Sequence, residues 1–225
     1  MAGGHAMLGT VESLSLVMEQ LEEDIVFGRL RPRERLVEEE LVDRFGVKRH
    51  IIRQALLELE RVGIVVRLRG KGARVCEFTP DEVEQLYSVR ELLEIKAASM
   101  IPLPADKDLI RELTAIHRLH AKAVDVGDLK TIYRANIRFH QVLYAACGNP
   151  YLAEAINMFA MKANVIRFYV GRDPRMFAGS RDQHEHMIEA LRNGAREELI
   201  DLCIRHLHPS PKAYIEAYRA LFGEV

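Results

Sequence analysis

Positively charged side chains cluster in the first third of the chain. Residues 44–74 include nine lysines and arginines but only two acidic residues, although the whole chain has a formal net charge of -1. Such an excess is expected of a surface that contacts the phosphate backbone of DNA, because the attraction is local and is screened over about 10 Å. A solvated face that contacts no partner would explain this local excess of positive charge equally well.

The spacing of two of these arginines favours contact with bases. Arg49 and Arg53 are four residues apart, so on a helix they project from one face, opposite apolar residues. The arginine fork matches the O6 and N7 acceptors of guanine, a contact that discriminates between bases by about 1–3 kcal/mol. We therefore predict that these two arginines read bases. The other predicted DNA contacts are Lys48, His50, Arg69 and Lys71. Of these, the two lysines and Arg69 would neutralise phosphates.

Histidine is concentrated in the second half of the chain, with seven of the nine beyond residue 116. Asn136 and His140 are four residues apart and face the same way on a helix, while His184 and His206 belong to two later helical segments. Neutral imidazole is a common ligand of zinc, nickel and related divalent transition metals, and facing helices of a bundle can form a cage for such an ion. Spacing alone leaves open the alternative that each is an isolated core or surface histidine.

The arginine pair belongs to a predicted winged helix-turn-helix. Apolar residues at helical spacing predict helices over residues 11–27, 37–45 and 48–61, the last two separated by a glycine turn. Residues 64–76 change to a β-branched, alternating pattern around a Gly-Lys-Gly turn, which predicts a hairpin with a basic tip. In a helix-turn-helix the second helix lies in the major groove, with its N-terminal residues at the base edges.

The rest of the chain is predicted to be all-helical. Thr79, Pro80 and Glu82 provide a capping hydroxyl, a proline at the first helical position and an acid at the third, so a new helix begins there. Every later segment has a helical period, with breaks that divide it into six or seven helices. The predicted fold class is mainly α. Its parts are a disordered leader over residues 1–10, the winged helix-turn-helix over 11–77 and the helical bundle over 78–225.

Several short motifs follow one another along the chain in a specific order. They are Leu30-x-Pro32, Phe45-Gly46-Val47, Arg53-x-Ala55-Leu56, Gly70-x-Gly72-Ala73-x-Val75 and Tyr87-x-x-Arg90-x-x-Leu93-Glu94. In this order they resemble the GntR family of transcriptional regulators, in the subgroup with a FadR-type, or FCD, effector domain. The resemblance runs over nearly the whole chain.

The chain departs from the family pattern at three places. Arg33 stands where the family usually has glycine, and Lys48-Arg49-His50-Ile51 stands where it often has Ser-Arg-Thr-Pro. Glu39 replaces a frequent arginine, which removes one expected DNA contact.

The resemblance implies a metal site in the helical domain. Many FCD domains carry Asp-x-x-x-His followed by two later histidines, and the register of this chain then selects as ligands Asn136, His140, His184 and His206. His186 and His208 are expected to support these ligands or to lie on the surface. Because asparagine replaces the usual aspartate, a divalent ion such as zinc or nickel would be bound with one negative charge fewer and less tightly.

The resemblance also implies that the effector is a small carboxylate. Arginine pairs a carboxylate bidentately, and the candidates are Arg90 and Arg167. As an alternative, Arg90 pairs only with an acid of its own helix, such as Glu94. Cys203, three residues before His206, suggests a thiolate ligand, but a buried apolar cysteine is the favoured interpretation.

These features predict a metabolite-responsive repressor that binds a palindromic operator in double-stranded DNA as a homodimer, since two-fold dimers read paired half-sites. Three widely spaced cysteines indicate a reducing cytoplasm, and no apolar run approaches the roughly 18 residues of a membrane span. An enzyme is not expected, because the common metalloprotease, P-loop and nucleophile-elbow motifs are missing. The alternatives are a helical metalloenzyme built on the histidine cluster and an architectural DNA-binding protein without a ligand.

Overall fold

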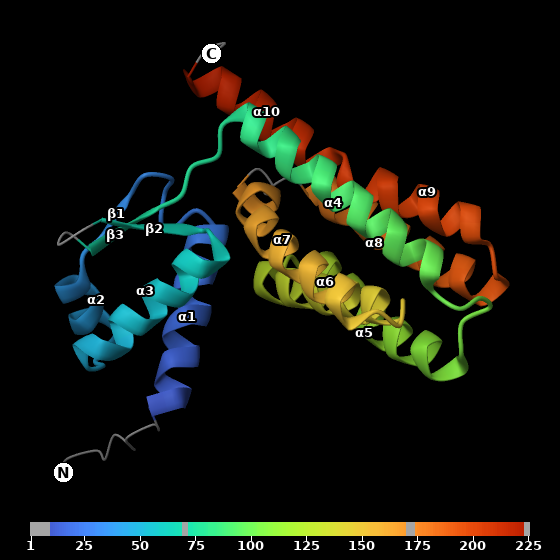
Figure 1. The fold of residues 1–225 in the computed structure, drawn as a ribbon, viewed down its shortest axis with the longest axis horizontal. Coiled ribbons are helices and arrows are strands. Elements are labelled where there is room, and N and C mark those ends of the chain that lie inside the picture. Colours follow the sequence, from blue (N-terminus) through green and yellow to red (C-terminus); the bar gives the residue numbers. More distant parts are fainter. Residues whose placement is uncertain (1–9, 69–71, 170–173, 223–225) are drawn as a thin grey trace. The chain divides into compact units, whose positions relative to one another are not determined.

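The structure is a computed structural model and describes residues 10–68, 72–169 and 174–222 (Figure 1). Within these ranges the chain forms ten helices and three short strands, so the predicted mainly α fold class is confirmed. The chain divides into two compact units, Met1–Glu77 and Phe78–Val225.

Three helices form the core of the N-terminal unit: α1 (Thr10–Val26), α2 (Glu38–Phe45) and α3 (Arg49–Val62). α3 packs against both α1 and α2. The predicted apolar stripes are buried in this core because each helix turns one face inward. The stripe residues are Val17, Leu21 and Ile25 of α1 and Ile52, Leu56 and Leu59 of α3.

A three-stranded antiparallel sheet completes the N-terminal unit. β3 (Gly72–Val75) lies between β1 (Arg35–Leu36) and β2 (Val65–Leu68). β2 and β3 form the predicted hairpin, whose tip lies outside the described residues. β1 is not expected from the sequence, because two residues are too few to show an alternating pattern. Gly72 allows β1 to approach, since a Cβ atom there would lie 2.4 Å from the carbonyl oxygen of Leu36.

Arg33 occupies a backbone conformation that favours glycine. Its φ angle of 65° lies in the left-handed region, which costs a residue with a Cβ atom roughly 1–2 kcal/mol. The backbone N–H of Arg33 donates to the carbonyl of Val75 over 3.1 Å, and its guanidinium group pairs with Glu77. These contacts hold the turn at the position where the family pattern has glycine.

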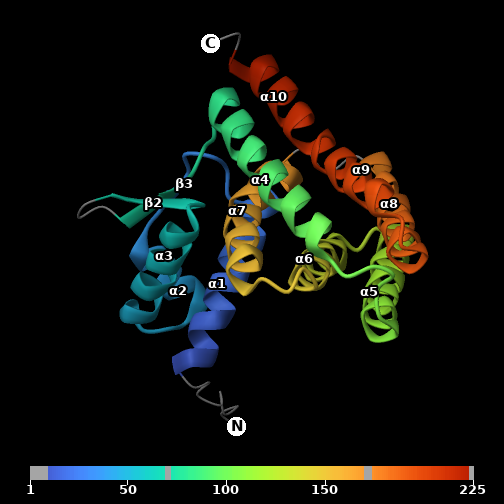
Figure 2. The ribbon, with the colours of Figure 1, turned by 45° about the vertical axis from the view of Figure 1, so that its right-hand side comes forward.

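Within its described residues, the C-terminal unit has seven helices, and six of them close into a ring. Each ring helix packs against the next in the spatial order α4, α7, α6, α5, α8, α9, and α9 returns to α4. The last helix, α10 (Pro209–Phe222), packs on α4, α7 and α9 (Figure 2). The ring helices are α4 (Pro80–Met100), α5 (Lys107–Val126), α6 (Leu129–Ala145), α7 (Pro150–Tyr169), α8 (Pro174–Asn193) and α9 (Arg196–Leu207).

Hydrogen bonds fix both ends of α4. At the N-terminus, Thr79 and Glu82 form the predicted capping box. At the C-terminus, the guanidinium group of Arg196 donates to the carbonyls of Ala98 over 3.4 Å and Ile101 over 3.1 Å. The carbonyls in the last turn of a helix have no partner within the helix, so Arg196 supplies one. Because both ends of α4 are fixed, the polar side chains in the middle of the helix, Arg90 and Glu94, are held in place.

Four residues join β3 to α4, and each is anchored. Cys76 and Glu77 bond to residues of the N-terminal unit, the first through its backbone N–H and the second through its carboxylate. Phe78 bonds to the hydroxyl of Tyr214 through both its N–H (3.4 Å) and its carbonyl (3.0 Å). Thr79 caps α4. The junction between the two units therefore has no unattached residue.

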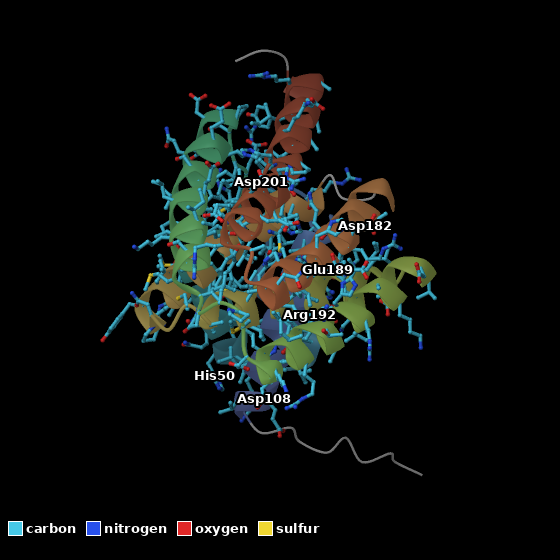
Figure 3. All side chains as sticks on the ribbon, turned by 90° about the vertical axis from the view of Figure 1, so that its right-hand side faces the viewer. His50, Asp108, Asp182, Glu189, Arg192 and Asp201 are labelled. Atoms are coloured by element: carbon cyan, nitrogen blue, oxygen red, sulfur yellow. The ribbon has the colours of Figure 1, made fainter. Side chains whose placement is uncertain are left out.

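Charged side chains cover the outer faces of the C-terminal helices. Asp108, Asp182 and Asp201 are examples, and all three are exposed and paired with an arginine (Figure 3). No helix among the described residues is both long enough and apolar enough to pass through a membrane.

Candidate DNA interface and metal centre

The N-terminal end of α3 carries most of the residues predicted to contact DNA. Lys48, Arg49, His50 and Arg53 are all exposed, and His50 is labelled in Figure 3. Lys48 is the N-cap residue, and its side chain caps none of the described N–H groups of α3. The N–H of Ile51 donates to the carbonyl of Lys48 over 2.9 Å, and no side chain of the N-cap competes with an anion such as a phosphate for the N–H groups before it. The remaining predicted contacts, which lie outside the described residues, are Arg69 and Lys71.

Each of the two arginines predicted to read bases is paired with a glutamate of α2. Nη2 of Arg49 donates to Oε1 of Glu39 over 2.9 Å, and Nε of Arg53 donates to Oε2 of Glu38 over 2.8 Å. The two glutamates differ in exposure, because 75% of the Glu39 side chain is accessible but only 22% of the Glu38 side chain. Glu39 therefore remains within reach of a ligand, whereas Glu38 is largely enclosed.

A hollow of about 410 Å³ lies between α2, α3 and the sheet whose β2–β3 hairpin forms the wing. Besides Arg49 and Arg53, its lining includes Arg35 of β1 and Arg67 of β2. Four guanidinium groups outnumber the carboxylates of Glu38 and Glu39, so the surface has the positive charge that suits a phosphate backbone. Sequence reasoning counted Arg67 only in the basic cluster and overlooked Arg35, which lies on the strand that was not predicted.

Each helix of the C-terminal ring contributes polar side chains to one interior centre. The rings of four histidines lie about 5 Å from one another in a chain of contacts, from His120 through His184 to His140 and His206. The side chains of this centre are Arg90 and Glu94 of α4, His120 of α5, His140 and Tyr144 of α6, Arg167 of α7, Gln183 and His184 of α8 and His206 of α9.

Three of these histidines direct their Nε2 atoms at one another. Nε2 of His140 lies 3.1 Å from Nε2 of His206 and 3.4 Å from Nε2 of His184. All three candidate ligand atoms lie within 4.8 Å of one another. A tetrahedral zinc ion with Zn–N distances of about 2.0–2.1 Å separates its nitrogen ligands by about 3.3–3.4 Å. The three imidazoles therefore fit a divalent transition-metal ion, since two of the nitrogen pairs are already close to this spacing.

The protonation of the rings supports the same interpretation. Nδ1 of His206 lies 2.8 Å from Oε1 of Gln183, so Nδ1 carries the proton and Nε2 keeps its lone pair for a metal. Burial, followed by two nearby arginines, lowers the pKa of His206 to about 3. Burial, followed by the neighbouring histidine His206, lowers the pKa of both His140 and His184 well below the ordinary value. All three rings are neutral near pH 7, which is the form that binds a metal.

Two further buried side chains at or beside the centre have unsatisfied polar atoms. Asn136, one turn before His140 on α6, is 3% exposed, and its Nδ2 has no hydrogen-bond partner among the described residues. His120 is 1% exposed, and neither of its ring nitrogens has such a partner. An unsatisfied buried polar group costs about 1–3 kcal/mol, so both sites are suited to an ion, a water molecule or a ligand. Sequence reasoning singled out Asn136 but missed His120, although its spacing of three residues from His117 on the same helix was a signal that could have found it.

The two arginines predicted to bind an anion lie beside the histidines. Arg90 is buried and donates to Oε1 of Glu94 through Nε at 3.0 Å and Nη2 at 2.8 Å, which is the alternative pairing left open by the sequence. Its Nη1 has no partner among the residues that the structure describes. Burial, and then the like charge of Arg90, lowers the pKa of the half-buried Arg167. Two guanidinium groups beside one carboxylate leave one positive charge that a monoanion would balance.

The other candidates from the sequence do not join this centre. His186 and His208 are exposed. Cys203 is not among the described side chains whose ligand atoms converge, which are His140, His184 and His206, and burial raises the pKa of its thiol to about 12.

The sequence matches two known family descriptions. Residues 85–209, more than half of the chain, match the FCD domain, and residues 15–75 match the bacterial regulatory proteins of the gntR family.

Relatives by sequence are HTH-type transcriptional regulators. The chain is 31% identical to YdhC of Bacillus subtilis (strain 168) over 134 residues, which is 59% of this chain and 60% of the relative. It is 28% identical to LutR of the same organism over 210 residues, which is 76% of this chain and 88% of the relative. The chain therefore spans less than two thirds of the length of YdhC and most of the length of LutR.

Solved structures of regulators share the fold. Escherichia coli McbR/YncC superposes with a TM-score of 0.79 at 19% identity, covering 94% of this chain and 100% of that one. A putative GntR regulator from Rhodococcus sp. RHA1 superposes with a TM-score of 0.76 at 22% identity, covering 92% and 99%. The motifs, the fold and the two family matches agree: the chain belongs to the GntR family of bacterial transcriptional regulators, in the subgroup that carries an FCD domain.

Proposed function

We propose that this regulator is a repressor that binds a palindromic operator as a homodimer and is controlled by a small carboxylate at a metal centre in the FCD domain. The family and its relatives are transcriptional regulators rather than enzymes, which removes the metalloenzyme alternative. The observation that carries the proposal is the convergence of three histidine Nε2 atoms beside two arginines.

The residues that would hold a divalent ion are His140, His184 and His206, with the amide oxygen of Asn136 as a fourth ligand. When bound, such an ion supplies a Lewis-acidic site for a carboxylate oxygen. All four ligands are neutral, so an anionic effector would meet the undiminished positive charge of the centre. This favours a small acid over a neutral sugar or an amine.

The carboxylate of the effector is proposed to pair with Arg90 and Arg167. Arg90 keeps one Nη group without a partner among the described residues. The positive charges of Arg90 and Arg167 repel each other, and a bound anion would offset this repulsion. Glu94 holds Arg90 from the other side, so the arginine is already oriented before the effector arrives. Control of DNA binding then requires that the effector binds one arrangement of the dimer more tightly than another.

Dimerisation is proposed from the chemistry of DNA reading and from exposed apolar residues. One helix-turn-helix contacts few bases, whereas a two-fold dimer reads two half-sites. α4 and α7 pack against each other, and both carry exposed apolar side chains. The most exposed are Leu92 at 72% on α4 and Tyr151 at 82% on α7. A second copy of the chain is the proposed cover for these residues, since an interface would remove their apolar surface from water.

A thermal-shift screen of small carboxylates, run with added zinc or nickel and with a chelator, tests the metal and effector proposals. We expect the metal to raise the melting temperature, and one class of acid to raise it further in a metal-dependent way. Stabilisation by a ligand grows with concentration, reaching about 2.7 kcal/mol at one hundred times its dissociation constant.

Two histidine variants on the last turn of α9 and just after it provide a matched pair. His206→Ala should abolish the shift caused by the metal, and His208→Ala, which removes an exposed ring, should retain it. Equal responses of the two variants, or no response of the native protein to zinc or nickel, would contradict the metal centre.

A further inference from the structure

We propose that Glu39 is a base-reading residue, which recognises a cytosine in the base pair next to the guanine bound by Arg49. The inference rests on the operator binding proposed above and goes beyond it by assigning a base to an acidic side chain. From the sequence pattern alone, Glu39 marks only the loss of an expected contact. The structure instead joins it to the arginine at the tip of the reading helix.

The position of the Glu39 carboxylate follows from its contact with Arg49. Nη2 of Arg49 lies 2.9 Å from Oε1 of Glu39, and stacked base pairs of DNA are about 3.4 Å apart. When the Arg49 fork meets the O6 and N7 atoms of a guanine, the carboxylate beside it reaches the edge of a neighbouring base pair. In that arrangement Glu39 would lie at the depth of the bases rather than at the depth of the phosphates.

The exposure and bonding of Glu39 leave an acceptor for DNA. Its side chain is 75% exposed, and the hydrogen bond to Arg49 uses Oε1. Oε2 is engaged by no described residue. A carboxylate can only accept hydrogen bonds, and in the major groove the N4 amino group of cytosine is the donor that suits a glutamate. A carboxylate that faced the groove without such a donor would repel the phosphates, so this residue should penalise sequences that lack the cytosine.

Glu38 has a different role on the same helix. Only 22% of its side chain is exposed, and it accepts from Nε of Arg53. The bond to Glu38 uses Nε, so the two terminal amino groups of Arg53 are not needed to hold this pair and can meet a base. Glu38 is therefore a positioning residue for Arg53, whereas Glu39 both positions Arg49 and contacts a base.

Selection from a random double-stranded DNA library with the full-length protein tests this inference without a known operator. The native protein should enrich a motif in which a cytosine neighbours a guanine in each half-site. In Glu39→Gln the amide can pair with N6 and N7 of adenine, so the preference at the cytosine position should shift towards adenine. The expected discrimination at that position is roughly 5- to 150-fold, which corresponds to the 1–3 kcal/mol of a good base contact.

Two variants separate the possible outcomes. Glu40→Gln makes the same change of charge at the next, exposed residue of α2 and should leave the motif as it is. Arg53→Ala should lose the motif altogether while remaining folded.

A Glu39→Gln motif identical to that of the native protein would overturn the inference and leave operator binding intact. So would a native motif without the neighbouring cytosine. Failure of the native protein to enrich any motif would instead overturn the operator binding on which the inference rests.

Discussion

At the scale of single residues, burial decides which side chains can react. Cys203 lies one turn from His206 on α9, but it is 1% exposed, and burial raises its pKa to about 12. The thiolate is the reactive form of cysteine, so almost none of it is present at pH 8.

We predict that iodoacetamide at pH 8 modifies Cys76, which is half-buried, well before Cys203 in the folded protein. Mass spectrometry of peptides after timed quenching measures the two rates. The control is the same reaction in guanidinium chloride, where both cysteines should react at similar rates. Rapid labelling of Cys203 in the folded protein would contradict its burial and would restore it as a candidate thiolate ligand.

Spacing along a helix explains which site residues could be predicted. Arg49 and Arg53 share a face because they are four residues apart, and Asn136 and His140 share one for the same reason. The positions of His184 and His206 relative to them came from the family pattern, because histidines on different helices have no fixed spacing in sequence. Other residues of the two sites had no such signal. They are Arg35, Gln183 and the two glutamates of α2. His120 did have a signal, because His117 lies three residues before it on α5.

At the scale of elements, the wing depends on one close approach of backbones. Gly72 has a φ angle of 81°, and a Cβ atom there would lie 2.4 Å from the carbonyl oxygen of Leu36. Gly46, at the end of α2, has a φ angle of 62°, but a Cβ atom there would meet nothing within 4 Å. The two glycines therefore differ in crowding while sharing a backbone conformation that disfavours other residues.

We predict that Gly72→Ala destabilises the N-terminal unit more than Gly46→Ala does. Both changes carry the left-handed penalty of roughly 1–2 kcal/mol, but only Gly72→Ala also separates β1 from β3. Chemical denaturation followed by circular dichroism gives both free energies of unfolding. Equal losses would mean that β1 is not held against β3 in solution.

Elements with a strong period were predictable, and those without one were not. The helices of the N-terminal unit begin and end within one residue of their predicted limits, because apolar spacing and glycine stops agree there. The ring of six helices was not predictable, since its spatial order differs from the order of the helices along the chain. The ring determines which side chains meet, and only the folded arrangement brings Arg90 of α4 next to Arg167 of α7.

At the scale of the whole molecule, the proposed dimer rests on exposed apolar residues of α4 and α7. Leu92 on α4 is 72% exposed, and Leu119 on α5 is 54% exposed. We predict that the native protein is a dimer, that Leu92→Glu is a monomer and that Leu119→Glu stays dimeric, because a buried unpaired charge opposes association. Light scattering after size-exclusion chromatography measures the masses. A dimeric Leu92→Glu would place the interface elsewhere.

The anchored junction after β3 has a consequence for how a signal travels. Glu77 is bonded within the N-terminal unit and Phe78 within the C-terminal unit, so the anchoring passes from one unit to the other at the peptide group between them. A slack linker would absorb any movement of α4 as a change in its own length. We predict that a rotation of α4 would instead reach the N-terminal unit as torsion, through the few backbone dihedral angles of these two residues. On the proposed function, the stiffness of this junction is then expected to set how strongly effector binding alters DNA binding.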